Sequence, residues 1–163
     1  MAKNTTILHQ GCVIGGSAHP ELAQRIPKLL NLPCAQIALT RFPDGELKPV
    51  VQKTSNCQVA IVVQPTPSPV NDHLVELLLS IEALYSADIR SVIAVVPYLG
   101  YARQCRRDIP GEPLSAKLVL QMIECAGAKA IVTVDLHDPS IVRFAKVPVR
   151  NVRVEETLAD YIK

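Results

Sequence analysis

Short apolar runs alternate with helix-patterned segments along most of this chain. Residues 56–66, 91–98 and 129–137 are rich in Val and Ile, as buried strands are. Residues 68–87 and 113–127 instead carry apolar side chains at helical spacing. Strands that alternate with helices are typical of a parallel sheet covered by helices on both faces. The sequence therefore predicts an α/β fold with a mainly parallel sheet.

Turn and cap signals bound the predicted elements. Residues 5–30 predict an earlier strand, a glycine turn and a helix. Ser68 is a candidate N-cap of the next helix, with Pro69 in its first turn. Gly127 is a stop signal for the helix that precedes it. We expect four side chains on the buried face of that helix: Leu118, Val119, Met122 and Ile123.

Length and composition exclude several classes of function. A chain of 163 residues suits one domain, with room for a fragment of a second. Aromatic residues make up only 4% and Trp is absent, so we expect no nucleic-acid partner that stacks on aromatic rings. The net charge of +2 means that a basic function must come from local clustering. There is no run of 18 apolar residues and no signal-peptide pattern, so we expect a cytoplasmic protein without a membrane partner.

The five cysteines are widely spaced along the chain. Their odd number and the lack of a Cys-x-x-Cys pair argue against a disulfide framework and a zinc site. We expect reduced, mostly buried thiols. Cys105 is the exception, because neighbouring arginines can lower the pKa of a thiol. A redox-sensing module that uses Cys105 therefore stays open as an alternative function.

Residues suited to anion binding follow two of the predicted strands. Three arginines lie in YARQCRRDIPGEP after the strand at 91–98, and Asp135 and His137 end the strand at 129–137. Ligands bind outside the carboxyl ends of strands in such sheets, so the two groups converge if the strands are neighbours. Arginine binds phosphate through charge-assisted hydrogen bonds, and imidazole with carboxylate can hold a divalent metal. This pattern predicts a nucleotide or pyrophosphate site with magnesium; a solvated basic loop is the alternative.

Two other features of the sequence are weaker candidates for a functional site. The turn in GGSAHPEL suggests dinucleotide binding by itself, but it lacks the Gly-x-Gly-x-x-Gly pattern. We expect His9, His19 and His73 to be structural or surface residues.

Six segments, in order, resemble the amino-terminal half of the ribose-phosphate pyrophosphokinase (phosphoribosyl pyrophosphate synthetase) family. They are GSAHPELAQ, RFPDGELKPVV, VVQPTPSPVNDHLVELLLSIEAL, VVPYLGYARQ, GEPLSAKLV and VDLHDPSI. The resemblance implies a phosphoribosyltransferase-like (Rossmann-like) domain over residues 1–150. Residues 151–163, with EETLADYIK, resemble the start of the crossing to a carboxyl-terminal domain.

The resemblance also implies an activity. The family transfers diphosphate from ATP to the 1-hydroxyl of ribose 5-phosphate, with magnesium, and makes phosphoribosyl pyrophosphate for nucleotide biosynthesis. By this likeness Phe42 would stack on adenine, while Asp44 and Glu46 would accept its hydrogen bonds. In the family this loop serves the site of a neighbouring subunit, so we expect a homo-oligomer.

The remaining roles implied by the resemblance fall on the two segments after the strands. Arg103 and Gln104 would bind the ATP phosphates, and Arg106 would assist them. His137 would lie at the magnesium ion and the phosphates, with Asp135 supporting it. Residues that bind phosphates and magnesium in this way stabilise the charge on a phosphoryl group during its transfer.

The sequence lacks two features of the family's second half. These are a flexible catalytic loop with Lys and Arg, and an Asp-Asp…Thr-Gly-Gly-Thr loop for ribose 5-phosphate. We expect this chain to carry the ATP side alone, to need a second domain or chain for ribose 5-phosphate, and to be inactive by itself. It is a piece cut at the domain boundary, a split subunit with a catalytic partner in a hetero-oligomer, or a non-catalytic regulatory subunit or scaffold. Whether the chain is an enzyme stays open at this point.

Overall fold

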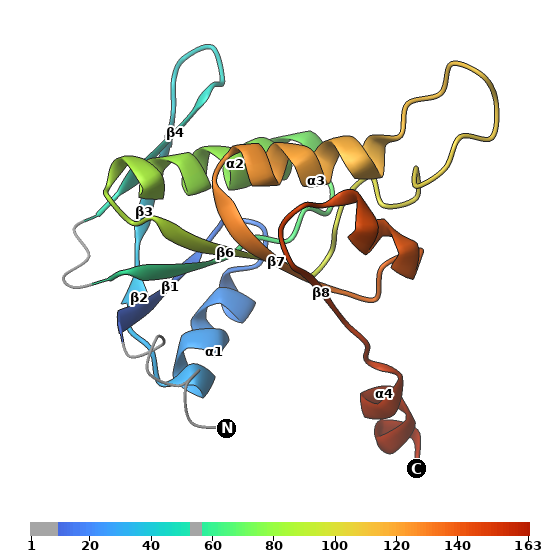
Figure 1. Cartoon of the computed structure of the whole chain (residues 1–163). Coiled ribbons are helices and arrows are strands. Elements are labelled where there is room, and N and C mark those ends of the chain that lie inside the picture. The colour runs from blue at the N-terminus through green and yellow to red at the C-terminus, as the bar shows by residue number, and fades with distance from the viewer. Residues whose placement is uncertain (1–9, 53–56) are drawn as a thin grey trace.

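The computed structural model of the chain describes residues 10–52 and 57–163 and centres on a six-stranded sheet (Figure 1). The strand order is β2-β1-β5-β6-β7-β8, and every neighbouring pair is parallel. The strands are β1 Gly11–Gly15, β2 Cys34–Ala35, β5 Val59–Val63, β6 Ser91–Val96, β7 Ala128–Val134 and β8 Val149–Val152. The predicted α/β fold with a mainly parallel sheet is confirmed.

Helices cover both faces of the sheet, as the strand pattern predicts. Helices α2 (Val70–Ser86) and α3 (Ser115–Cys125) lie on one face, and α1 (Pro20–Leu30) lies on the other (Figure 1). Alternate residues of each strand point to opposite faces. In β1, Ile14 packs into the core beneath α2 and α3, whereas Val13 packs toward α1. Full burial of one such side chain contributes roughly 1.5–3 kcal/mol.

Details of helices α2 and α3 differ from the sequence prediction. Helix α2 begins at Val70 with Pro69 at the N-cap, so Ser68 is not its cap. In α3, Val119 and Ile123 are buried as expected, but Leu118 is 56% exposed. Leu120 and Ala116 are buried instead, and Met122, also expected on the buried face, is only half-buried. The predicted stop at Gly127 is consistent with its φ of +117°, just after the helix ends.

A β-hairpin forms a separate two-stranded sheet that the sequence analysis did not predict. Strands β3 (Ile37–Arg41) and β4 (Leu47–Val51) pair antiparallel, with Arg41 opposite Leu47 at the tip. The hairpin packs alongside α2, and its tip extends beyond that helix (Figure 1). Gly45 has a φ of +96°, which explains why a glycine follows Asp44 in this turn.

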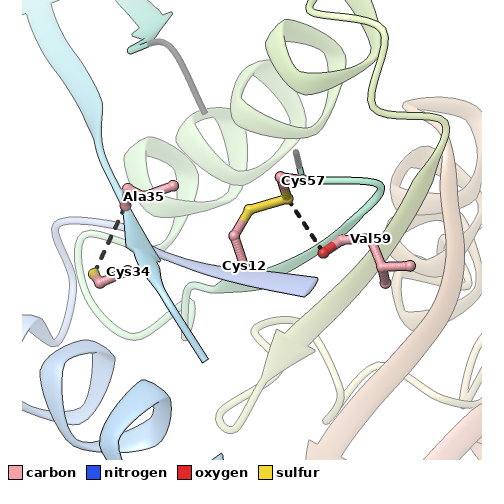
Figure 2. Close-up of a disulfide and its surroundings, with 5 residues drawn as sticks. All are labelled: Cys12, Cys34, Ala35, Cys57 and Val59. Atoms are coloured by element: carbon pink, nitrogen blue, oxygen red, sulfur yellow. Dashed lines mark hydrogen bonds between the residues drawn. A yellow bond between two sulfur atoms is a disulfide. The ribbon is translucent and has the colours of Figure 1, made fainter. Parts of the chain in front are cut away.

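Two cysteines form a disulfide, which corrects the expectation of reduced thiols. Cys12 in β1 is bonded to Cys57, two residues before β5 begins, and their Cα atoms are 5.7 Å apart (Figure 2). Strands β1 and β5 are neighbours, with Cys12 opposite Ala60. The sheet thus brings together two cysteines that are 45 residues apart along the chain. The expectation of burial also fails for Cys34 and Cys125, which are exposed free thiols.

The carboxyl-terminal segment continues from the sheet into a short helix. A 3-10 helix, η2 (Pro139–Phe144), leads to β8, which continues the sheet past residue 150. Helix α4 (Glu155–Ile162) follows and buries none of its side chains. The predicted domain boundary after residue 150 stays a prediction. Within residues 10–52 and 57–163, no helix combines the length and apolar character needed to cross a membrane.

Candidate functional site

A cavity of about 450 Å³ lies where the segments after β6 and β7 meet. Its lining comes from residues within 98–104, from residues 134–137 and from Val70. Strands β6 and β7 are neighbours, with Val96 opposite Thr133. The two strands are therefore neighbours, as convergence of the two segments requires. The arginine segment and the segment with Asp135 and His137 share one edge of the sheet.

The segment after β6 is held close to the segment after β5. The Gly100 amide donates to Thr66 Oγ1 at 2.7 Å, and the Thr66 amide donates to the Tyr98 carbonyl at 2.8 Å. A Cβ on Gly100 would lie 2.6 Å from Val70 Cγ1 and 3.0 Å from the Thr66 carbonyl oxygen. This close approach requires glycine, and it sets the path of the residues that follow toward the cavity.

Replacing Gly100 with alanine should therefore lower the free energy of unfolding by about 1–3 kcal/mol, the usual range for overpacking a filled site. The added methyl group must displace Val70, which lines the cavity, or the Thr66 backbone. Urea unfolding of the two proteins measures the change. An unchanged midpoint and slope would contradict the close approach.

Two residues of the cavity wall adopt left-handed backbone conformations. Tyr101 has a φ of +64° and Asp135 a φ of +43°, and the described residues include only two other non-glycine cases. The Tyr101 hydroxyl donates to Asn71 Oδ1, which holds the ring against α2. Non-glycine residues in this region carry strain of order 1–3 kcal/mol and cluster at functional sites. The backbone here is consistent with a ligand-binding wall.

Strand β8 holds the segment after β7 in place. The Asp135 amide donates to the Val152 carbonyl at 3.0 Å, and the Leu136 amide donates to Asn151 Oδ1 at 3.1 Å. The Val154 amide in turn donates to Asp135 Oδ1 at 3.3 Å. The side chains of Asp135 and His137 remain exposed at the cavity. Their positions therefore depend on the strand beside them.

Asp138 ends this segment and caps η2. Its Oδ1 accepts a 2.7 Å hydrogen bond from the Ser140 amide, which lowers the pKa of the Asp138 carboxyl. Its other oxygen lies 4.0 Å from the Cys105 Sγ atom. Cys105 is half-buried and faces a carboxylate, whereas the sequence led us to expect arginine neighbours. The alternative of a redox module based on Cys105 gains no support from this contact.

The predicted phosphate-binding residues separate into two groups. Arg103 and Gln104 line the cavity, and the Gln104 backbone carbonyl accepts from the Ala116 amide at 3.1 Å, which ties the segment to α3. Arg106 lies outside the lining and pairs with Asp108 at 3.0 Å. Arg107 donates to the Glu112 carbonyl at 2.9 Å. Among the described residues, Arg103 takes part in none of the salt bridges, so its charge is available to a ligand.

The predicted adenine-binding residues lie at the hairpin tip and do not line this cavity. Phe42 is 46% exposed, and the Lys48 ammonium lies 5.4 Å from the centre of its ring. The Glu46 amide donates to Asp44 Oδ1 at 3.1 Å. The exposed turn that the Asp-Gly pair predicts is confirmed, but the structure does not bring this loop to the cavity of its own chain.

The histidines outside the cavity are structural where the structure describes them. His19 caps α1, and its Nδ1 accepts from the Leu22 amide at 3.1 Å. His73 Nδ1 donates to the Pro67 carbonyl at 2.9 Å. His9 lies outside the described residues. Within those residues, no three His, Cys, Asp or Glu side chains gather as a metal-binding group.

Sequence reasoning missed several residues that build the cavity. Thr66, Asn71 and Asn151 position its walls through hydrogen bonds, as does the close approach of Gly100. Asn151 lies near the carboxyl end of β8, and Thr66 follows the carboxyl end of β5 by three residues; these positions are the signal in the sequence that could have found them. Gly100 carries a second signal, because it is a glycine at the start of a turn and stands between two large residues, Leu99 and Tyr101.

Comparison with known proteins gives consistent matches over nearly the whole chain. Residues 12–127 match the family described as the N-terminal domain of ribose phosphate pyrophosphokinase. The ribose-phosphate pyrophosphokinase of Wolinella succinogenes is 40% identical over 93% of this chain and 49% of its own length. That of Bacillus caldolyticus is 37% identical over 95% of this chain and 49% of its own length.

A solved structure agrees with these matches. The phosphoribosylpyrophosphate synthetase of Mycobacterium smegmatis superposes with a TM-score of 0.89 at 35% identity, over 93% of this chain and 51% of that one. The chain thus spans about half the length of the curated relatives it matches. From the family match and these relatives, we conclude that the chain belongs to the family of the N-terminal domain of ribose phosphate pyrophosphokinase.

Proposed function

We propose that this chain supplies the ATP-binding half of a ribose-phosphate pyrophosphokinase, which transfers diphosphate from ATP to ribose 5-phosphate in the cytoplasm. One observation carries the proposal. Arg103, Gln104, Asp135 and His137 line the same cavity of about 450 Å³ at the carboxyl ends of β6 and β7. A guanidinium, an amide, a carboxylate and an imidazole suit a polyphosphate with its cation.

Arg103 is the principal phosphate ligand in this proposal. Its guanidinium has no carboxylate partner among the described salt bridges, so it can donate two hydrogen bonds to phosphate oxygens. The Gln104 side chain lies beside it and already accepts from the Ser115 hydroxyl, so its amide nitrogen is the group that faces a phosphate. Phosphoryl transfer needs positioning and charge stabilisation above all, and these residues supply both.

Asp135 and His137 would hold magnesium together with the nucleotide. Magnesium in phosphate sites is typically bound by one or two carboxylates, with the remaining ligands from phosphates and water. One exposed carboxylate beside the phosphate-binding segment fits that requirement, and the His137 imidazole, which lines the same cavity, would contact a phosphate. When bound, the ion would neutralise phosphate charge. Asp135 is held for this task by its two hydrogen bonds with residues 152 and 154.

A second copy of the chain would complete the adenine side. Phe42, Asp44 and Glu46 form an exposed loop outside the cavity of their own chain. An exposed aromatic ring flanked by carboxylates can stack on a base and accept hydrogen bonds from it. The proposal therefore includes a homo-oligomer, or a hetero-oligomer with a catalytic partner. Ribose 5-phosphate would bind to a second domain or chain, since the relatives are about twice as long.

A non-catalytic regulatory subunit of the same fold is the second candidate. The basic loop favours it, because Arg106 is paired with Asp108 and Arg107 is bonded to the Glu112 carbonyl. Two of the three arginines are thus engaged within the loop. Such a subunit would keep the fold and the interfaces but would not support turnover.

Titration calorimetry of the chain with ATP and magnesium, together with sedimentation, tests the proposal. We expect an oligomer that binds magnesium-ATP. A folded oligomer that does not bind it would contradict an ATP-binding role. Addition of the carboxyl-terminal half of a relative, followed by an assay for phosphoribosyl pyrophosphate, separates the two candidates, because only a catalytic half supports product formation.

A further inference from the structure

Arg41 links the tip of the hairpin to the body of the domain. It is the last residue of β3, and its Nη1 donates to the Gly45 carbonyl at 2.8 Å. Its Nη2 donates to Asp72 Oδ2 at 3.2 Å. Asp72 lies in the first turn of α2. A single guanidinium therefore contacts both the tip loop and the helix beside it.

We infer that Arg41 is a positioning residue that fixes the direction of the Phe42–Glu46 loop relative to α2. The inference rests on the proposed function, in which this loop binds the adenine of ATP. We do not expect Arg41 itself to contact the nucleotide. It acts through the loop, by reducing the number of orientations in which Phe42 and the two carboxylates are presented.

The internal hydrogen bonds of the loop set its shape but not its direction. The Phe42 amide donates to the Glu46 carbonyl and the Gly45 amide donates to the Phe42 carbonyl, both at 2.9 Å. The Glu46 amide donates to Asp44 Oδ1. All three bonds stay within residues 42–46. Among the described residues, the hydrogen bond from Arg41 to Asp72 is the one that joins the tip to another element.

The chemistry of the guanidinium suits this double contact. Its donors lie in a rigid planar fork, so it can serve a carbonyl and a carboxylate at once in fixed geometry. A lysine ammonium is a point charge on a flexible stem and holds such a pair less rigidly. The side chains of Arg41 and Asp72 are each 52% exposed. Exposed pairs add little to global stability, so the main effect falls on local order.

Local order matters for binding because a flexible loop must be fixed when the ligand arrives. A loop held in its binding conformation avoids part of that entropy loss. Removal of the Arg41 contacts should therefore lower the affinity for ligands that contact the loop. The affinity for ligands that do not contact the loop should not change. Tripolyphosphate shares the phosphate chain of ATP but has no adenine, so it reports on the cavity alone.

The experiment compares the wild-type chain with Arg41→Ala, Arg41→Lys and Asp72→Asn. Arg25→Ala is the matched control, because Arg25 also forms an exposed ion pair, with Glu21 at 4.0 Å on α1. Hydrogen exchange at the Phe42 and Gly45 amides reports on the loop without any ligand. Titrations with magnesium-ATP and magnesium-tripolyphosphate then report on binding.

For Arg41→Ala we expect exchange at the two amides to rise about tenfold and ATP affinity to fall about 3- to 10-fold. Tripolyphosphate affinity should not change. Arg41→Lys and Asp72→Asn should give intermediate values, and Arg25→Ala should behave as wild type. Unchanged loop exchange in Arg41→Ala would overturn the inference, and so would equal losses for both ligands.

The two readouts separate failure of this inference from failure of the proposed function. A folded wild-type chain that binds neither ligand overturns the proposed function and the nucleotide role of Arg41 with it. Hydrogen exchange still decides in that case whether Arg41 holds the loop. A wild-type chain that binds both ligands equally well removes the adenine role of the loop, while the phosphate site stands.

Discussion

Replacing Cys57 with serine should lower the free energy of unfolding by about 4 kcal/mol, the value that the chain-entropy model assigns to a loop of this length. The Cys12–Cys57 bond closes a loop of 45 residues, which contains α1, β2 and the hairpin. Without the cross-link, the unfolded chain gains the conformations that the closed loop excludes. Because domains of this kind are stable by only about 5–15 kcal/mol, the loss is a large fraction of the total.

Urea unfolding with and without dithiothreitol measures this effect. Reduced wild-type protein should match Cys57→Ser, and the variant should not respond to dithiothreitol. Serine is placed at position 57 because that site is half-buried, whereas Cys12 is 2% exposed in the core, where a lone hydroxyl would add a desolvation penalty. Cys34→Ser and Cys125→Ser are the matched controls, since both thiols are exposed and free. A wild-type midpoint that dithiothreitol does not shift would show that the bond does not form in solution.

Replacing Arg103 with alanine should weaken magnesium-ATP binding by about 1.5–3 kcal/mol, or roughly 10- to 150-fold. Arg103 lines the cavity and has no competing ion pair among the described residues, so the full charge-assisted interaction with phosphate is lost. The fold should be unaffected, because the side chain is exposed. Titration calorimetry against ATP and against tripolyphosphate should give similar losses, since both ligands carry the phosphate chain.

Arg107→Ala is the matched control for this measurement. Arg107 lies four residues further along the same loop, but it donates to the Glu112 carbonyl and does not line the cavity. We expect its loss to change affinity by about twofold or less, as for other exposed contacts. Equal effects of the two variants would mean that the loop acts by its net charge. An unchanged affinity in Arg103→Ala would remove that residue from the site.

Much of the fold follows from local pattern. Strands β5 to β7 were predicted because each is a short, nearly continuous apolar run, as buried parallel strands are. Helices α2 and α3 were predicted because their apolar residues recur at helical spacing. The location of the cavity was also predicted, because ligands bind where the carboxyl ends of adjacent parallel strands share one edge of the sheet. Arg103, Gln104, Asp135 and His137 meet there as expected.

The features that were missed depend on distant contacts. The hairpin strands carry weak alternation, with Pro49 within β4, and they are stabilised by packing on α2. The disulfide depends on two strands becoming neighbours, which spacing along the chain does not reveal. The exposure of Leu118 depends on how α3 is rotated against the sheet. In each case tertiary contacts select among options that the local sequence leaves open.

The attachment of Asp135 to strand β8 has a mechanical consequence. Three hydrogen bonds join residues 135 and 136 to residues 151, 152 and 154, and the chain leaves the sheet immediately afterwards through α4. Tension or rotation at the point where the chain leaves the sheet would be transmitted to the Asp135 carboxylate through those bonds, and to β7 through its pairing with β8. The position of Asp135 in the cavity is thus mechanically coupled to the segment through which the chain leaves the sheet.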